Sequence, residues 1–476
     1  MPLVIHARKC HGDASHLDAG LGIQASQTSI PDLYFTTTTA DITTPTTTIT
    51  TRITGTTSLP PVALPPSPPH GPPAPIKRGD PFPHARIFRI VRRRARTAIM
   101  LSWAKSTLAA VAGTQEPEYG PDAIQPVGTK GDEPAYTELT KKDLKWVTLD
   151  YTNVETQTFY IFTDAGHTGF LQVIYNSIAG LRVTVQFNCK LFYPNNEKPF
   201  LWASDPVHNY GFDEDQHSFY ADGVSIELAA DGNSYEIKAA VNENSMVNVK
   251  FTRTAPGFMG GKDGMTNYGT DPKAPWGSMH HHFWPRCSVE GTIITKEGEV
   301  DLKGRGMLSH ALQGMKPHHA AARWNFANFQ SPSYSAIIME FTTPASYAST
   351  VVRVCGIATD GKLLFANTDG AKVEHTETKQ DETGWAEPTA ASYHWAGKTE
   401  DGKEVTADLA GSLGKNIDRV DVMAEVPGFI KTLVANAAGT KPYIYQYAPK
   451  LTIKIKVGDE VKEEEGTLFT EATFVS

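Results

Sequence analysis

The sequence has few of the features that mark a disulfide-bonded, secreted or membrane-spanning protein. Its 476 residues include only four cysteines, which lie far apart and form no CxxC pair. No run of about 18 apolar residues is present for a transmembrane helix, and no early apolar segment with a cleavage site indicates a secretory signal. Scattered cysteines without such a signal fit a reducing compartment. We therefore expect a cytoplasmic protein that associates with membranes peripherally.

Common catalytic motifs are also missing. The sequence contains no GxSxG nucleophile motif, no GxxxxGK[ST] phosphate loop and no GxGxxG after a strand. The glycine-rich run from Pro256 to Gly264 precedes no helix, and we interpret it as a long mobile loop that could close over a barrel. The sequence therefore predicts no catalytic residue and no cofactor.

Glutamate is absent from the first 99 residues and frequent after Glu116. Those 99 residues hold eleven Lys and Arg against five Asp, so they contribute +6 to the net charge of −8 and leave −14 for residues 100–476. An acidic body argues against nucleic acid as a partner. The leading residues are rich in Thr, then Pro, then Arg, and cannot bury a core. We expect 1–99 to be a disordered extension; a misplaced gene start is an alternative.

A short amphipathic helix is predicted for residues 100–113. Apolar residues recur there at spacings of three and four and share one helical face. A helix this short is marginal in water, so it needs a surface to fold on, and an indole at the edge of its apolar face favours a membrane interface. The expected membrane-binding residues are Met100, Leu101, Trp103, Ala104, Leu108 and Val111. The alternative is a helix that docks on the protein's own body.

Strict alternation of apolar and polar residues is the clearest pattern in the rest of the chain. From Arg182 to Tyr193, every second residue is apolar, and the same period of two recurs in 247–251 and 451–457. Half-buried strands of an antiparallel sheet have this pattern. Long amphipathic helices are nearly absent after residue 113. The predicted fold class is therefore all-β.

The length of the β-rich region predicts two barrels rather than one. About 340 residues of short strands exceed what one small barrel uses. We place a linker at 114–135, a first domain at 136–307 and a second at 308–476, with the seam in the polar run from Gly304 to Ala322. A barrel of about eight strands can hold one small apolar ligand.

Three consecutive histidines stand out in the run PWGSMHHHFWPRC, from Pro275 to Cys287. In an extended segment neighbouring residues face opposite sides, so at most His280 and His282 can converge on one ion. A structural zinc site would also need cysteine or carboxylate partners at set spacings. We therefore predict no metal here.

Aromatic residues around these histidines suggest a lipid-binding wall. Alternation places Trp324 and Phe326 on one face, and aromatic walls with a few polar groups suit a lipid whose head carries hydroxyls or an amide. The candidate lipid-binding residues are Trp276, His280, His282, Trp284, Arg286, Trp324, Phe326, Phe329 and Tyr334. The alternative is that these side chains are ordinary core, as most Trp and Phe in β-proteins are.

Several segments in order resemble the fungal survival-factor family. They are MLSWAKSTLAAVAG from Met100, EPEYG, YTNVETQTFY, FYADGVSIEL, the histidine run, and GMKPHHAAARWNFANFQS. The resemblance covers residue 100 to the C-terminus. It implies two lipocalin-like domains in tandem and a cytosolic protein whose N-terminal helix contacts Golgi and endoplasmic reticulum membranes.

The same resemblance implies an activity. It is the binding of ceramide or a related sphingolipid and its movement between those membranes, with roles in sphingolipid homeostasis and survival of oxidative stress. An enzyme is the alternative, because tandem lipocalin-like chains also resemble carotenoid hydratases and fungal cyclases that act on apolar substrates. His282, Arg286 and Tyr334 would be the first catalytic suspects in that case. A stress-response scaffold without a ligand is a third class.

Overall fold

The computed structural model describes residues 119–129, 131, 133–178, 182–424 and 441–476. All of these residues belong to one compact unit. The predicted extension at 1–99 and the predicted helix at 100–113 lie outside the described residues, so their structures stay predictions. None of the helices in the described part of the chain is long and apolar enough to cross a membrane.

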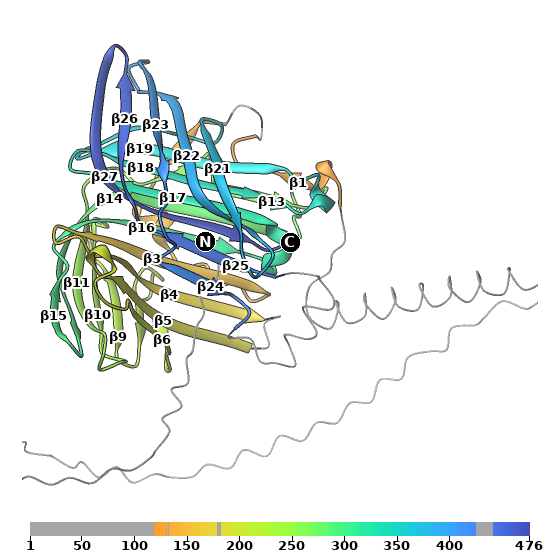
Figure 1. Cartoon of the computed structure of the whole chain (residues 1–476). Helices are drawn as coiled ribbons and strands as arrows, with labels where there is room; N and C mark the ends of the chain where they lie inside the picture. Colours follow the sequence, from red (N-terminus) through yellow and green to blue (C-terminus); the bar gives the residue numbers. More distant parts are fainter. Residues whose placement is uncertain (1–118, 130, 132, 179–181, 425–440) are drawn as a thin grey trace, which may run out of the picture. The chain divides into compact units, whose positions relative to one another are not determined.

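The described chain is built almost entirely from strands in two antiparallel sheets (Figure 1). The strands of the first sheet are β1 (Ile124–Gln125), β2 (Tyr136–Glu138), β3 (Asn153–Thr163), β4 (Thr168–Ile178), β5 (Arg182–Phe192), β6 (Leu201–Pro206), β7 (Gly211–Phe212), β8 (Phe219–Ala221), β9 (Val224–Leu228), β10 (Ser234–Ala239), β11 (Met246–Arg253), β12 (Phe258–Gly260), β13 (Met265–Tyr268), β14 (Gly277–Thr295), β15 (Gly298–Asp301) and β16 (Gly304–Gln313). Its main order is β6-β5-β4-β3-β16-β14-β11-β10-β9-β8-β7.

The second sheet follows in sequence. Its strands are β17 (Arg323–Gln330), β18 (Ser335–Thr342), β19 (Val351–Thr359), β20 (Lys362–Asn367), β21 (Ala371–Gln380), β22 (Ala386–Lys398), β23 (Glu404–Ser412), β24 (Asp418–Asp421), β25 (Tyr443–Tyr447), β26 (Lys450–Val457) and β27 (Glu460–Phe474). The main order is β20-β19-β18-β17-β27-β26-β23-β22-β21. The described helices are single turns: η1 (Pro121–Ala123), η2 (Lys141–Leu144), η3 (Pro194–Asn196), α2 (Pro317–Ala320) and η4 (Ala345–Tyr347).

The prediction of an all-β chain is confirmed, and in place of the two predicted barrels the structure has two curled antiparallel sheets in tandem. Each sheet curls around its own apolar core, which holds Phe159 and Phe187 in the first sheet and Ile338 and Ile455 in the second. In the described residues no backbone ladder joins the edge strands β6 and β7, so the first sheet is curled rather than closed by hydrogen bonds.

The alternation in β5 shows how the sequence builds these layers. Val185, Phe187 and Cys189 point into the first core, whereas Lys190 and Phe192 point to the other face. Side chains on successive residues of a strand point to opposite faces, so β5 has apolar residues on one face throughout and uses the other face for contacts with the second sheet. The strand predicted from Arg182 is confirmed.

A third core joins the two sheets. The ring of Tyr160 on β3 lies 5.2 Å from that of Phe326 on β17 and 5.4 Å from that of Phe469 on β27. Beside this apolar layer the fully buried Lys190 places Nζ 2.5 Å from Asp418 Oδ2 and 2.7 Å from Gln446 Oε1. The first sheet is therefore tied to the second by packing and by a buried ion pair.

The connection between the sheets is shorter than the predicted seam. Residues 304–313 form β16, which pairs with β3 and β14 in the middle of the first sheet. The expected boundary between 307 and 308 falls inside this strand. The chain passes from one sheet to the other only at 314–322, where α2 lies. The polar residues of β16 suggested a linker between domains. A buried strand can carry such residues when the neighbouring strands supply hydrogen-bond partners.

The prediction of a mobile loop from Pro256 to Gly264 was wrong. Residues 258–260 form β12, which pairs with β2 and β14 and is buried. The glycines permit close packing instead: a Cβ on Gly257 would lie 2.7 Å from Trp284 Cδ1, and one on Gly260 would lie 2.8 Å from Thr368 Cγ2. Such distances are shorter than any ordinary carbon contact, so these positions require glycine.

Candidate functional site

A row of polar side chains crosses the interior of the first sheet on three adjacent strands. His282 on β14 pairs with His310 on β16, which in turn pairs with Gln157 on β3. The next row on the same face of these strands consists of Trp284, Leu308 and Phe159, which belong to the first core. Because side chains alternate along each strand, all three polar residues face the same core.

His310 is held in one orientation by a buried carboxylate. Its Nε2 lies 2.8 Å from Glu155 Oε1, and Glu155 is fully buried. The same carboxylate accepts backbone N–H bonds from Val147 at 2.8 Å and Thr148 at 2.7 Å. Since Glu155 acts as an acceptor throughout, His310 donates to it from Nε2, and His310 Nδ1 is left without a partner of regular geometry.

His280 and His282 lie side by side at the end of this row. Their Nε2 atoms are 2.5 Å apart, so one ring donates a hydrogen bond to the other. Burial lowers the pKa of His280 to about 4, an effect that His310 increases and Glu155 opposes. Burial also holds the pKa of His282 well below its usual value. Both rings are therefore neutral at pH 7.

The predicted convergence of His280 and His282 on one face is confirmed, with His281 turned the other way toward Trp324. Among the described residues, however, no group of three or more His, Cys, Asp or Glu side chains is placed to hold a metal ion. The two imidazoles form a hydrogen bond with each other instead.

Several polar atoms around this row have no hydrogen-bond partner of regular geometry among the described residues. They are Trp146 Nε1, Gln157 Nε2 and Oε1, His217 Nδ1 and Nε2, Tyr235 Oη, Trp284 Nε1 and His310 Nδ1. Their side chains are between 0 and 9% exposed. A buried donor or acceptor without a partner costs about 1 to 3 kcal/mol. So many in one interior therefore indicate that another molecule supplies the missing partners.

Ring contacts join four of these residues in two pairs, Tyr235 with Trp284 and Trp146 with His310. The ring of Tyr235 on β10 lies 5.2 Å from that of Trp284 and 5.3 Å from that of Phe159. Burial raises the pKa of Tyr235, and a hydrogen-bonding contact with the Gln157 amide, short of regular geometry, opposes that shift. The ring of Trp146 lies 5.3 Å from that of His310. We call Trp146, Gln157, Tyr235, Trp284 and His310 the interior cluster.

Trp146 reaches the interior from a segment that lies between the first core and solvent. In this cover segment, residues 139–149, Leu139, Leu144 and Trp146 are buried in the core, while Val147 is 43% exposed. Thr148 has φ of 48°, a strained conformation for a β-branched residue. The cover segment is fixed by the two bonds to Glu155 and by a bond from Trp146 N to Gln216 O.

The nine predicted lipid-binding residues do not line one wall. His280, His282 and Trp284 face the interior of the first sheet, whereas Trp276, Trp324 and Phe326 pack in the core between the sheets, and Phe329 and Tyr334 pack in the second core. Only the first three contribute to the interior cluster or its surroundings.

Arg286 ties the two sheets together. Its Nε donates to Asp360 Oδ1 at 2.7 Å, Nη1 lies 3.1 Å from Ser331 O and from Ser335 Oγ, and Nη2 lies 2.5 Å from Pro332 O. Arg286 is 1% exposed, and its hydrogen bond lowers the pKa of Asp360. With its donors used in this way, the guanidinium serves the contact between β14 and the second sheet.

Sequence reasoning missed Trp146, Glu155, Gln157, Tyr235 and His310. A signal was present in β3, where Glu155 and Gln157 lie on the same face of the strand as the core residues Phe159 and Ile161. Polar residues on the apolar face of a strand need partners inside the sheet. The partners themselves come from strands far apart in sequence, so their identity required the fold.

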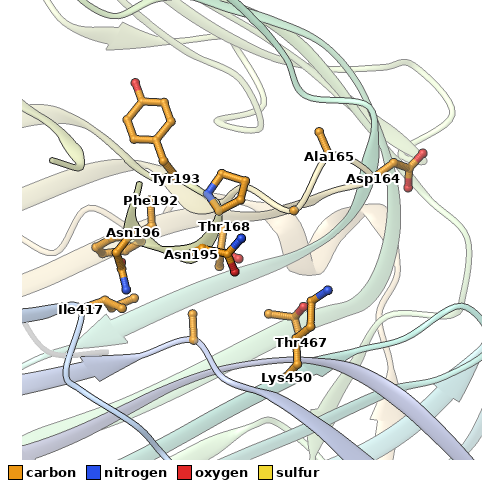
Figure 2. Close-up of a pocket in the computed structure, with 13 residues that line it drawn as sticks. Asp164, Ala165, Thr168, Phe192, Tyr193, Asn195, Asn196, Ile417, Lys450 and Thr467 are labelled. Atoms are coloured by element: carbon orange, nitrogen blue, oxygen red, sulfur yellow. The ribbon is translucent and has the colours of Figure 1, made fainter. Parts of the chain in front are cut away.

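A cleft of about 540 Å³ opens elsewhere, between the two sheets (Figure 2). It is lined by the turn before Thr168, by the end of β5 with η3, and by Ile417, Lys450 and Thr467 of the second sheet. In Figure 2 the ring of Tyr193 points away from these last three residues. Polar loop side chains make up much of the lining. A smaller cleft of about 180 Å³ includes Trp324.

Comparisons with known proteins assign the family. The sequence profile of the Svf1 family matches residues 101–476. A ceramide-binding protein svf1 of Emericella nidulans is 59% identical over 381 residues, and one named SVF1 of Candida albicans is 46% identical over 388 residues; each match covers 79% of this chain and 100% of the relative.

Solved structures with similar folds are distant in sequence. The crystal structure of CghA has a TM-score of 0.48 at 10% identity and covers 68% of this chain and 89% of its own. Kievitone hydratase from Nectria haematococca has a TM-score of 0.42 at 11% identity and covers 76% and 98%. By its sequence, which matches the family profile over most of its length, this chain belongs to the Svf1 family.

Proposed function

We propose that this chain binds ceramide and moves it, chemically unchanged, between endoplasmic reticulum and Golgi membranes, in support of sphingolipid homeostasis and of survival under oxidative stress. The observation that carries the proposal is the interior cluster. Its buried donors and acceptors have fewer hydrogen-bond partners among the described residues than they can use, and they lie inside an aromatic core. The names of the relatives, which are ceramide-binding proteins, supply the ligand.

The chemistry of a ceramide suits such an interior. Its amide and hydroxyls can pair with the unpaired atoms of Gln157, Tyr235 and His310, while its two chains are sheltered from water. Covering apolar surface stabilises a complex by about 25 cal/mol per Å². Of the predicted residues, His280, His282 and Trp284 are the ones that this arrangement uses.

The lipid enters where the cover segment lies. Leu139 and Leu144 fill part of the first core in the structure, so a guest with two long chains has to displace them. Strain at Thr148 and the exposure of Val147 favour this segment over any paired strand as the part that moves. Glu155 holds the cover segment in place, because its carboxylate accepts hydrogen bonds from two backbone N–H groups of that segment.

Transfer between vesicles tests the activity. Purified full-length protein is mixed with donor vesicles that contain ceramide and with acceptor vesicles that lack it. We expect ceramide of unchanged mass in the acceptors, in proportion to the protein added. No ceramide in the acceptors, or none bound to protein purified from its own cells, would contradict the proposal.

The proposed membrane contact is tested separately by Leu108→Asp. A carboxylate on the apolar face of the predicted helix at 100–113 should release the protein from membranes, because a charge there opposes insertion. Ser106→Asp, which adds the same charge off that face, is the matched control. Sedimentation with Golgi and endoplasmic reticulum membranes measures both. Equal sedimentation of the two variants would argue for a helix docked on the protein itself.

Catalysis on an apolar substrate is the second candidate, favoured by the Glu155–His310 pair. A histidine oriented by a buried carboxylate, with Nδ1 free to take a proton, has the arrangement of a general base. In the vesicle experiment, this candidate predicts a lipid of altered mass that disappears in His310→Gln.

A further inference from the structure

We infer that the interior cluster of the first sheet binds the head of the lipid, and that it accepts only an uncharged, amide- or hydroxyl-bearing head. This inference rests on the proposed function and adds to it the place of the ligand and the chemical selectivity of the site. It also excludes the interior of the second sheet as the place where the head is bound.

The unpaired atoms of the cluster have the mixed character that a neutral polar head requires. Trp146 Nε1 and Trp284 Nε1 can only donate, and the Nδ1 of a neutral His310 accepts. Gln157 and Tyr235 can both donate and accept, and their contact with each other uses only one donor and one acceptor of this set. An amide carbonyl can accept from an indole, while hydroxyls or an amide N–H can donate to His310 or Gln157. A phosphate offers acceptors only, so it would leave the acceptors of the cluster without partners.

The charges that face the cluster disfavour an anionic head. Glu155 is buried beside His310, the carboxylates of Asp143 and Asp263 act on His280, and that of Asp213 acts on Tyr235. The one cation found against the cluster in the described chain is Arg253, 5.5 Å from the Trp284 ring and bonded to Asn233 Oδ1 at 2.7 Å. A buried phosphate would therefore meet several negative charges and a single, already paired positive one.

A cationic head is disfavoured for a different reason. Glu155, the carboxylate within the row, already accepts from His310, Val147 and Thr148. An ammonium group in the interior would have to take these bonds away from Glu155 or remain unpaired. Burial of an unpaired charge costs far more than burial of an unpaired neutral group.

The second sheet lacks a comparable set of free atoms. In its core, Trp395 Nε1 donates to Ile337 O at 3.0 Å, and Tyr393 Oη lies 2.9 Å from Thr470 Oγ1. Tyr445 Oη donates to Asp381 Oδ2 at 2.6 Å. A polar head that entered there would have to break bonds that the protein already makes.

The test loads the full-length protein from four vesicle preparations, which carry ceramide, diacylglycerol, ceramide 1-phosphate or sphingosine. Ceramide 1-phosphate differs from ceramide in a phosphate at the head, and sphingosine has an ammonium group in place of the amide and lacks the acyl chain. Ceramide 1-phosphate, which keeps both chains, therefore carries the test of head selectivity. We expect ceramide to load at least about tenfold better than either charged lipid, which corresponds to the loss of about one hydrogen-bonded contact. Diacylglycerol, which is uncharged and hydroxyl-bearing, should load better than both charged lipids.

Variants then locate the head. Gln157→Leu and Tyr235→Phe remove unpaired polar atoms, and each should lower ceramide loading about fivefold to tenfold. Tyr393→Phe is the matched control in the second sheet and should leave loading within about twofold. Thermal unfolding of each variant checks the fold. If Gln157→Leu does not fold, Tyr235→Phe, which removes a single oxygen, carries the test.

The outcomes separate the two proposals. If the wild-type protein carries no ceramide, the proposed function fails and the inference fails with it. If ceramide is carried but ceramide 1-phosphate or sphingosine loads equally, the selectivity is wrong. If Tyr393→Phe lowers loading while Gln157→Leu and Tyr235→Phe do not, the head lies in the second sheet and the inference is overturned while the proposed function stands.

Discussion

Trp284 in the first sheet and Trp395 in the second are both fully buried, but of the two indoles only that of Trp395 has a hydrogen-bond partner among the described residues. Tyr393 has a hydrogen bond to Thr470 of regular geometry, whereas the contact of Tyr235 with Gln157 falls short of that geometry. The two sheets share an architecture and an aromatic content. They differ in whether the polar end of each aromatic side chain meets a partner from the protein itself.

This difference has consequences for the stability of the two cores. A core with paired polar atoms is more stable and has one preferred packing, because every polar group has a partner of its own. A core with unpaired atoms gives up stability that a ligand can restore on binding. The second sheet is tied to the first by Arg286 and by the Lys190–Asp418 pair.

The largest expected effect comes from replacing the two tryptophans. Trp395→Phe should lower the free energy of unfolding by about 3 kcal/mol, because it removes core volume and a buried hydrogen bond. Trp284→Phe should cost about 1 kcal/mol less, because its indole N–H has no bond to lose. Urea unfolding of the ligand-free protein measures both. Equal costs would contradict the comparison.

Trp284 also tests the ligand. Beyond its effect on stability, Trp284→Ala should lower lipid loading more than Trp395→Ala does. If Trp284→Ala lowers only the melting temperature and leaves loading intact, the residue is ordinary core.

Acidification gives an effect of comparable size, to which the histidines in the interior of the first sheet contribute. Burial keeps the pKa of His280 at about 4 and that of His282 low in the folded protein, below the value of about 6.5 in the unfolded chain. The unfolded state then binds more protons below pH 6.5, so stability is complete above that pH and is lost as the pH falls toward 4.

The histidine contribution can be isolated by substitution. Between pH 7 and pH 5 the two residues together should account for about 3 to 4 kcal/mol of lost stability. The variant that combines His280→Asn and His282→Asn should lose correspondingly less over this interval, as measured by urea unfolding at both pH values. His375→Asn in the second sheet is the control, and a larger effect there would reverse the assignment.

The smallest expected effect comes from single hydroxyls. Tyr393→Phe should cost about 1 kcal/mol, because Thr470 loses a partner. Tyr235→Phe should cost less than Tyr393→Phe in the ligand-free protein, because the Tyr235 hydroxyl has only an irregular contact with Gln157 to lose. A shift in the melting temperature of the same sign and size in both variants would show that Tyr235 has a partner after all.

Local patterns in the sequence predicted much of the fold. Alternation identified β5 and β11, because the period of two depends only on the backbone of a strand. The same rule placed His280 and His282 on one face. It failed for Pro256 to Gly264, where glycines serve close packing against Trp284 and Thr368 rather than a mobile loop.

The candidate site was only partly predictable. Aromatic composition indicated an apolar interior but could not divide Trp276, Trp284 and Phe329 among three different cores. Arg286 was expected to face a ligand, and the structure gives it four protein partners instead. Which neighbour a buried polar group meets depends on strand order and register, and neither is encoded in a local pattern.

By itself the sequence determined that this chain is β-rich, acidic after residue 99 and similar to the Svf1 family, because composition, alternation and shared segments are properties of the chain alone. Only the tertiary structure decided which polar atoms remain unpaired. That outcome requires Gln157, Tyr235, Trp284 and His310, from four strands, to meet in one interior with fewer partners than they need. Hydrogen-bond satisfaction is a property of the assembled core, where each group competes for the same few neighbours.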